Sequence, residues 1–350
     1  MDAQDDMDYT LELPDELIEM IFWNLPYKTI FQQICEKVCR RWKTIAQRVF
    51  HAQYLKKWKA YEACAIEPKQ LKLHGRTLTT LAMGSNGNIY TGSPDCTIRV
   101  WSDGSCIKSM HGTTSIYELA MGDDAVYSLS DNDDIQKWYV AGDAWLLDAK
   151  FHLDTSDTNT CVSAIAVGLD GKIYTGGSNG SIYVWTTDDT HSLLQTLRGH
   201  TGVIDALHVD RNGQLYSGSG DTTIRVWSGV DSRQLYILQG HTEIVCHITT
   251  GNDGLIYSAS GDTTIRIWLD CGGAFGAHFG TLKGHKGIVW SVAVDLYGTI
   301  FSVADDETLR VWSGVDWRLM YTCQSCTWNI VAGIDGNIYT DASDEALQIW

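Results

Sequence analysis

Short apolar runs separated by turn-forming residues dominate the chain from residue 73 to residue 350. In one unit, VIDALHV is followed by QLYSGS, TIRVWS and QLYILQ, with Asn212-Gly213, Gly220-Asp221 and Gly229 to Asp231 between the runs. Alternating apolar and polar positions bounded by Gly, Asn and Asp are typical of β-strands joined by tight turns. The pattern therefore predicts four short strands in each unit.

The same pattern returns at a nearly fixed interval. SGSGDTTIRVW at residues 217–227 is followed 41 positions later by SASGDTTIRIW at residues 258–268. A tryptophan closes each of seven such units: Trp101, Trp138, Trp185, Trp227, Trp268, Trp312 and Trp350. A fixed-period repeat of this length indicates structural units that stack on one another.

Four side chains recur within the units at spacings of 17, 4 and 6 residues. The sets are His74, Thr91, Asp95 and Trp101; His200, Ser217, Asp221 and Trp227; His241, Ser258, Asp262 and Trp268; and His285, Ser302, Asp306 and Trp312. These units resemble WD repeats, the blades of a β-propeller, in which the four side chains hydrogen-bond in series. The resemblance implies a mainly β, seven-bladed propeller and a structural role for the four tetrads. A catalytic reading would require four near-identical active sites in one chain.

Three units depart from the tetrad pattern. The second has His111 and Ser128, but Asn132 stands in place of the aspartate. The third has Thr158 and Asn179, unless His152 serves in place of Thr158 across a short insertion. In the seventh, Cys323 occupies the histidine position.

Residues 11 to 47 carry a helical pattern instead. Leu17, Ile18, Ile21, Phe22 and Leu25 form one apolar stripe that begins after Pro14 and ends at Pro26, and a second stripe runs from Ile30 to Ile45. About 35 residues cannot bury two apolar helical faces unaided, so the remaining surface must contact either the propeller or a partner.

The motifs in this segment resemble the F-box, a three-helix motif that docks on the Skp adaptor of cullin–RING ubiquitin ligases. They are Leu13-Pro14, Ile21-Phe22, Leu25-Pro26 and Val38-Cys39-Arg40-Arg41-Trp42, whereas Thr29-Ile30 departs from the usual Asp-Leu of the family. The resemblance indicates that the remaining apolar surface contacts a partner protein rather than the propeller. It implies these adaptor contacts: Leu13, Pro14, Leu17, Ile18, Ile21, Phe22, Leu25, Pro26, Val38 and Trp42.

The domain organisation follows from these patterns. We expect a disordered acidic tip at residues 1–10, the F-box at 11–47, a helical linker at 48–68 and the propeller at 69–350. The chain stops at the third strand of the seventh unit. Because KQLKLHG at 69–75 aligns with LQTLRGH at 194–200, residues 69–73 are predicted to supply the missing outer strand of the last blade.

The net charge and the cysteines indicate which kinds of partner and which cellular compartment to expect. Residues 1–72 are neutral overall, so the net charge of −17 belongs to the propeller and disfavours nucleic acid and anionic membranes. Ten scattered cysteines without an apolar leader favour free thiols in a reducing compartment, cytoplasmic or nuclear. Cys323-x-x-Cys326 is an isolated pair, so we expect no metal and no cofactor.

No motif predicts catalysis. Residues 176–180 match G-x-S-x-G, but strands flank them on both sides, whereas a nucleophile elbow needs a strand-to-helix turn. We therefore expect a non-catalytic protein.

The expected substrate-binding face carries the links between units. In related F-box propellers that bind phosphorylated peptides, arginines lie five residues after the GH histidine and one before the tetrad aspartate. Neither set of positions contains Arg or Lys here. This composition predicts a basic and aromatic peptide rather than a phosphorylated one, with an apolar or aromatic anchor and Lys or Arg beside it. The anchor pocket is expected at Trp290 and Trp328, unless these tryptophans only cover the channel mouth. The candidates are Thr79, Tyr117, Asp131, Asp154, Asp157, Ser163, Asp205, Trp290, Asp305 and Trp328.

The sequence thus predicts the substrate-recognition subunit of an SCF-type ubiquitin ligase, with the F-box bound to the Skp adaptor and the propeller bound to a target protein. The alternative is a non-catalytic WD-repeat interaction scaffold without a ligase role.

Overall fold

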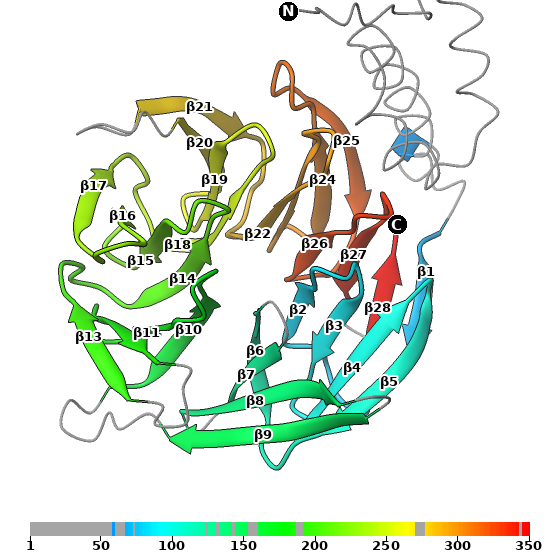
Figure 1. The fold of residues 1–350 in the computed structure, drawn as a ribbon. Coiled ribbons are helices and arrows are strands. Elements are labelled where there is room, and N and C mark those ends of the chain that lie inside the picture. The colour runs from blue at the N-terminus through cyan, green and yellow to red at the C-terminus, as the bar shows by residue number, and fades with distance from the viewer. Residues whose placement is uncertain are drawn as a thin grey trace, which may run out of the picture. The chain divides into compact units, whose positions relative to one another are not determined.

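The computed structural model describes residues 58–59 and 67–350, except 73, 123–124, 131–132, 142–143, 153–159, 187–191, 270–276 and 343–344. The chain divides into two units, Met1–Glu67 and Pro68–Trp350. In the first unit, Trp58 and Lys59 are helical and the Trp58 side chain is buried. In the second, the described strands form seven four-stranded antiparallel sheets arranged around a centre (Figure 1). This confirms the predicted seven-bladed propeller.

Each sheet is one blade, and the first strand of each lies innermost. The strands of blades 1 to 3 are β2 (Thr80–Met83), β3 (Ile89–Gly92), β4 (Thr97–Ser102) and β5 (Ser105–His111); β6 (Ile116–Met121), β7 (Ala125–Ser130), β8 (Asp134–Ala141) and β9 (Ala144–His152); and β10 (Val162–Val167), β11 (Ile173–Gly177), β12 (Ile182–Trp185) and β13 (Leu193–Leu197).

Blades 4 to 6 repeat this order, and blade 7 takes its fourth strand from the other end of the propeller. Their strands are β14 (Ile204–Val209), β15 (Leu215–Ser219), β16 (Ile224–Trp227) and β17 (Gln234–Leu238); β18 (Val245–Thr250), β19 (Leu255–Ser260), β20 (Thr264–Leu269) and β21 (Ala277–Lys283); β22 (Val289–Val294), β23 (Ile300–Ala304), β24 (Thr308–Trp312) and β25 (Leu319–Gln324); and β26 (Ile330–Ala332), β27 (Ile338–Asp341), β28 (Ala346–Ile349) and β1 (Lys69–Lys72).

The ring closes through β1 and β28. These strands pair antiparallel, with Lys69 opposite Ile349 and Leu71 opposite Leu347. Figure 1 shows β1 beside β28, although the two strands come from opposite ends of the propeller sequence. Pairing of this kind leaves no open gap in the ring, where unpaired backbone groups would otherwise be exposed.

The hydrophobic core lies between neighbouring blades. One cluster joins Ile98 and Val100 of blade 1 to Ile116 and Val126 of blade 2, and equivalent clusters follow around the ring. Close packing needs small residues in the second strands. A Cβ on Gly218 would approach the Val245 side chain of the next blade to 2.6 Å. Neighbouring blades are therefore in close contact at this position, as is usual in protein interiors.

Two local expectations bear on function. The G-x-S-x-G stretch forms the turn between β11 and β12, with Gly180 at a φ of 76°, so strands flank it and no helix follows. None of the described residues belongs to a helix with the length and apolar character needed to cross a membrane.

Candidate functional site

The four complete tetrads form the predicted hydrogen-bonded series. In each, the histidine Nδ1 lies 2.7–3.1 Å from an aspartate oxygen and its Nε2 lies 2.7–2.9 Å from a Ser or Thr hydroxyl. The tryptophan Nε1 donates to the same hydroxyl at 2.8–2.9 Å. Each histidine follows the outer strand of one blade, whereas its partners belong to the next blade. The tetrads therefore tie neighbouring blades together.

Burial sets the charge state of these groups. Desolvation lowers the pKa of His241 despite the opposing effect of Asp262, and it lowers the pKa of His285 to about 4. Desolvation alone would raise the pKa of Asp221, but hydrogen bonds from Thr223 and Thr201 lower it to about 2. The tetrads thus hold neutral histidines against ionised aspartates, and they lie away from the residues that line the central cavity. This arrangement fits a structural role.

The three irregular blades keep only part of the series. Trp138, Trp185 and Trp350 still donate to Ser128, Thr175 and Thr340 at 3.0, 2.9 and 3.0 Å. His111 is exposed at the end of β5, and Cys323 is buried in β25. Asn132 and Thr158 lie outside the described residues.

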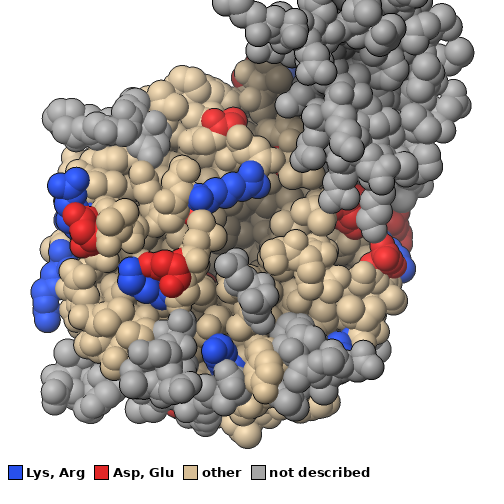
Figure 2. Space-filling view, in the orientation of Figure 1, with Lys and Arg blue, Asp and Glu red and all other residues tan. Residues whose placement is uncertain are grey.

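The first strands of all seven blades enclose a central cavity of about 810 Å³. Figure 2 shows one face of the propeller, hollowed near its middle and formed mostly by uncharged residues. We define the channel mouth as the cavity end lined by the seven residues at equivalent positions of the first strands. They are Thr79, Tyr117, Ser163, Asp205, Cys246, Trp290 and Trp328, and the structure brings all seven to the same cavity.

The other predicted face residues are placed differently. Asp305 lies in the turn between β23 and β24, and its Oδ1 accepts a hydrogen bond from the Trp290 indole. Asp131, Asp154 and Asp157 lie outside the described residues.

Two mouth residues have hydroxyl groups that are already engaged. Thr79 donates to the Ile116 carbonyl at 2.5 Å, and Ser163 donates to the Ile204 carbonyl at 2.6 Å. Both bonds run to the next blade. Thr79 and Ser163 thus line the mouth, but their polar groups link blades and are not turned toward a ligand.

An aromatic pair occupies blades 6 and 7 of the mouth. The rings of Trp290 and Trp328 stack with centroids 6.1 Å apart and planes inclined by 17°. Trp328 is 66% exposed, and Tyr117 on blade 2 is 51% exposed. Large flat apolar surfaces that remain exposed at a cavity edge are typical of protein-binding sites.

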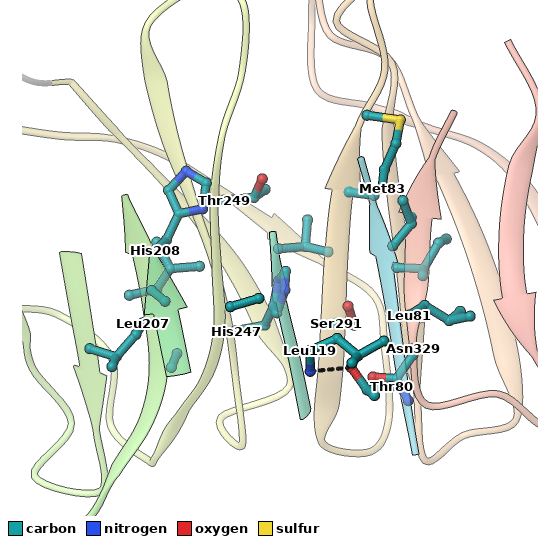
Figure 3. Close-up of a pocket in the computed structure, with 18 of the residues that line it drawn as sticks. Thr80, Leu81, Met83, Leu119, Leu207, His208, His247, Thr249, Ser291 and Asn329 are labelled. Atoms are coloured by element: carbon teal, nitrogen blue, oxygen red, sulfur yellow. Dashed lines mark hydrogen bonds between the residues drawn. The ribbon is translucent and has the colours of Figure 1, made fainter. Parts of the chain in front are cut away.

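Deeper in the cavity, polar side chains that the sequence patterns did not single out link the blades. Glu118 accepts a hydrogen bond from the Ile165 backbone at 2.9 Å, and His208 contacts the Thr250 hydroxyl at 2.9 Å. Figure 3 shows His208 and His247 directed into this cavity. Burial raises the pKa of Glu118 to about 8 and lowers those of both histidines to about 4, so His208 and His247 are neutral near pH 7. Only their place on the innermost strands could have marked them.

The described residues contain no cluster of three or more His, Cys, Asp or Glu side chains that could hold a metal ion. The described part of the cavity is a concave space lined by aromatic rings at Trp290 and Trp328 and by the Asp205 carboxylate. These are features of a binding site.

Comparison with family models agrees with this architecture. The model described as "WD domain, G-beta repeat" matches residues 67–102, 191–228, 232–268 and 276–313, and an F-box-like model matches residues 10–55. The propeller is thus a WD40 propeller. With its F-box-like domain, the chain belongs to the F-box/WD-repeat protein family. The sequence matches none of the curated proteins with which it was compared.

The family match bears on the predicted adaptor contacts. All ten, from Leu13 to Trp42, fall within the F-box-like match, and all lie outside the described residues. An F-box implies binding to the Skp adaptor, and a WD40 propeller implies binding to a protein. The individual contacts remain a prediction.

Proposed function

We propose that this protein is the substrate-recognition subunit of an SCF-type ubiquitin ligase. The F-box-like segment binds the Skp adaptor and, through it, the cullin–RING catalytic subunits. The propeller binds the protein to be ubiquitinated, and the transfer chemistry belongs to the other subunits.

The observation that carries this proposal is the pairing of two different binding elements in one chain. The F-box-like match covers residues 10–55, and the propeller that follows presents a stacked aromatic pair, of which Trp328 is exposed, at the mouth of a central cavity. A scaffold could use the propeller alone, but it would not need a docking motif for a ligase adaptor. The apolar positions of that motif also need a partner surface, because so short a segment cannot bury them by itself.

The test measures adaptor binding by the full chain. Leu13→Ala combined with Pro14→Ala removes the Leu-Pro pair of the motif and should weaken binding to purified Skp adaptor by at least about tenfold, or about 1.4 kcal/mol. The melting transition of the propeller should stay unchanged, because the two substitutions lie in the other unit. A reconstituted cullin–RING complex should then ubiquitinate a protein captured by the unmodified chain and not one captured by the double variant.

Trp328→Ala is the matched control, because it alters the propeller and should leave adaptor binding unchanged. If the full chain does not bind the adaptor, or if the double variant binds it within a few fold of the unmodified chain, the interaction-scaffold alternative holds and the ligase role is wrong.

A further inference from the structure

The channel mouth has two chemically different halves. Asp205, Cys246, Trp290 and Trp328 lie at equivalent positions of the consecutive blades 4 to 7 and line the same cavity. On blades 1 and 3, the Thr79 and Ser163 hydroxyls are directed to backbone carbonyls instead. The half formed by blades 4 to 7 instead carries a carboxylate on blade 4 and a stacked aromatic pair on blades 6 and 7.

The aromatic pair is held in place from both sides. The Trp290 indole N–H donates to Asp305, which fixes the orientation of that ring. The backbone N–H groups of Trp328 and Asn329 both donate to Asp341 Oδ1 at 2.8 Å. A surface that is ordered before its partner arrives loses less entropy on binding, which favours affinity.

Asp341 is specific to the last blade. The register places Asp341 opposite Leu347, a position at the end of the second strand that Gly92, Gly218 and Ala259 occupy in other blades. Asp341 is buried, and its other oxygen accepts a hydrogen bond from the Asn329 side chain at 3.2 Å. A buried carboxylate is costly unless it is fully hydrogen-bonded. Its bonds here all serve the segment that presents Trp328.

Asp205, by contrast, has an oxygen without a partner. Its Oδ2 is buried and makes no hydrogen bond within the described part of the chain. The pKa of the neighbouring Cys246 thiol is raised to about 12, mainly by burial and further by the carboxylates of Asp205, Asp305 and Asp262. The effect of these carboxylates shows that the electrostatic potential around Cys246 is negative. Burial also raises the pKa of Asp205 itself.

Among the described residues that line this cavity, Arg211 is the one Lys or Arg side chain. It follows the far end of β14, whereas Asp205 lies near its start. The extended strand from Asp205 to Val209 already separates their backbones by roughly 13 Å, and Arg211 lies beyond it in the following turn. Arg211 therefore lies toward the opposite end of the strand from Asp205, and burial sets the pKa shift of Asp205.

We propose that the channel mouth binds an unphosphorylated peptide through two adjacent side chains. A Lys or Arg side chain enters the mouth and pairs with Asp205, and a flat apolar or aromatic side chain beside it packs on the Trp290–Trp328 pair. This inference rests on the proposed function, since such a peptide would be the recognition signal of the ligase substrate. Among the described residues of the mouth, a phosphate has no basic partner, and it is repelled by Asp205 and Asp305.

The experiment measures peptide binding by the full chain, both alone and with the Skp adaptor added. The probes are N-acetylated, C-amidated nonapeptides in which one central position is Arg, Lys, Gln, Glu or phosphoserine and the next is Trp, Leu or Ser. Fluorescence polarisation should rank Arg or Lys followed by Trp or Leu highest, by at least about tenfold over the Gln and phosphoserine series. The advantage over the Gln series should shrink with salt, because the ion pair is screened.

Two variants separate the two contacts. Asp205→Asn keeps the size of the side chain and should lower affinity for the Arg and Lys peptides about tenfold, with little effect on the Gln series. Trp328→Ala should weaken all peptides that carry Trp or Leu. The controls are Asp231→Asn and Phe279→Ala, an exposed acid and an exposed aromatic residue away from the cavity. Neither should change binding.

The inference is overturned if phosphoserine peptides bind best, or if Asp205→Asn leaves the preference for a basic residue intact in a complex that melts normally. The two proposals fail separately. A chain that selects basic peptides but does not bind the Skp adaptor upholds this inference and refutes the ligase role. A chain that binds the adaptor but shows no preference for basic peptides upholds the ligase role and refutes this inference.

Discussion

Blades 1, 4, 5 and 6 differ from blades 2, 3 and 7 in one feature, the histidine–aspartate half of the tetrad. The first group has all four members, and it coincides with the four segments that match the WD40 family model. The second group keeps the Trp-to-hydroxyl bond. Both groups form the same four-stranded sheets. The bond between the second and third strands is therefore common to every blade, and the histidine adds a connection between blades.

This difference indicates which contacts stabilise the ring. A blade without the histidine link depends on the apolar contacts with its neighbours, such as the cluster of Leu129, Ile135, Ile165 and Tyr183 between blades 2 and 3. Blade 7 depends in addition on a strand supplied from the start of the propeller. Stability should thus respond most strongly to the closure of blade 7, then to the tetrads, and least to the charge state of a single histidine.

The largest expected effect comes from opening the ring. Deleting residues 69–72 from the full chain removes β1, exposes the edge of β28 and removes Leu71 from the cluster that contains Trp101 and Leu347. Losing four residue pairs of the strand ladder and one partly buried leucine should lower the free energy of unfolding by about 3–6 kcal/mol. Chemical denaturation followed by tryptophan fluorescence measures this loss. Lys69→Ala with Gln70→Ala keeps the strand and should cost less than about 1 kcal/mol. A deletion as harmless as this control would mean that β1 does not close the ring.

The next effect compares the two groups of blades through one identical change. Ser258→Ala in blade 5 leaves two buried groups without their partner, His241 Nε2 and the Trp268 indole. Ser128→Ala in blade 2 leaves the Trp138 indole without its acceptor. At about 1–3 kcal/mol for each buried group left unsatisfied, Ser258→Ala should destabilise the propeller by about 2–6 kcal/mol and Ser128→Ala by about half of that. Equal losses in urea denaturation would show that the histidine link contributes nothing beyond the tryptophan bond.

Much of this architecture could be predicted from the sequence, because each blade repeats the same local solution. Trp268 and Ser258 can be assigned by spacing alone, since their bond is formed within one hairpin-connected sheet. The mouth positions were also predictable, because a residue at a fixed distance from the histidine position of each repeat, occupied by Cys323 before Trp328, must return to the same level of the ring. Trp290 and Trp328 illustrate this, as they occupy that position in adjacent blades.

Other parts of the site could not be predicted, because they depend on contacts between side chains of different blades. The repeat pattern of the sequence does not specify such contacts. The stacking of Trp290 on Trp328 depends on how blades 6 and 7 are inclined, and the free Asp205 oxygen depends on what surrounds it in space. Glu118 and His208 lie on the inner strands β6 and β14, Asp341 lies at the end of β27, and none of the three belongs to a side-chain pattern that recurs from blade to blade. Their partners lie up to 47 residues away in sequence, so spacing gives no indication of the contact.

The smallest effect concerns the pH dependence of stability. Burial lowers the pKa of His285 to about 4, against 6.5 for the ordinary side chain. Between these values the unfolded chain binds a proton that the folded chain does not, so stability from this group is present above about pH 6.5 and is lost as the pH falls toward 4. One such histidine changes the free energy of unfolding by at most about 1.4 kcal/mol per pH unit. His285→Gln should therefore flatten the slope measured by urea denaturation between pH 7 and pH 4.5. His111→Gln, at an exposed position in an irregular blade, should leave the slope unchanged. If both variants keep the original slope, the acid sensitivity of the propeller does not come from its tetrads, and the two groups of blades would not differ in their response to pH.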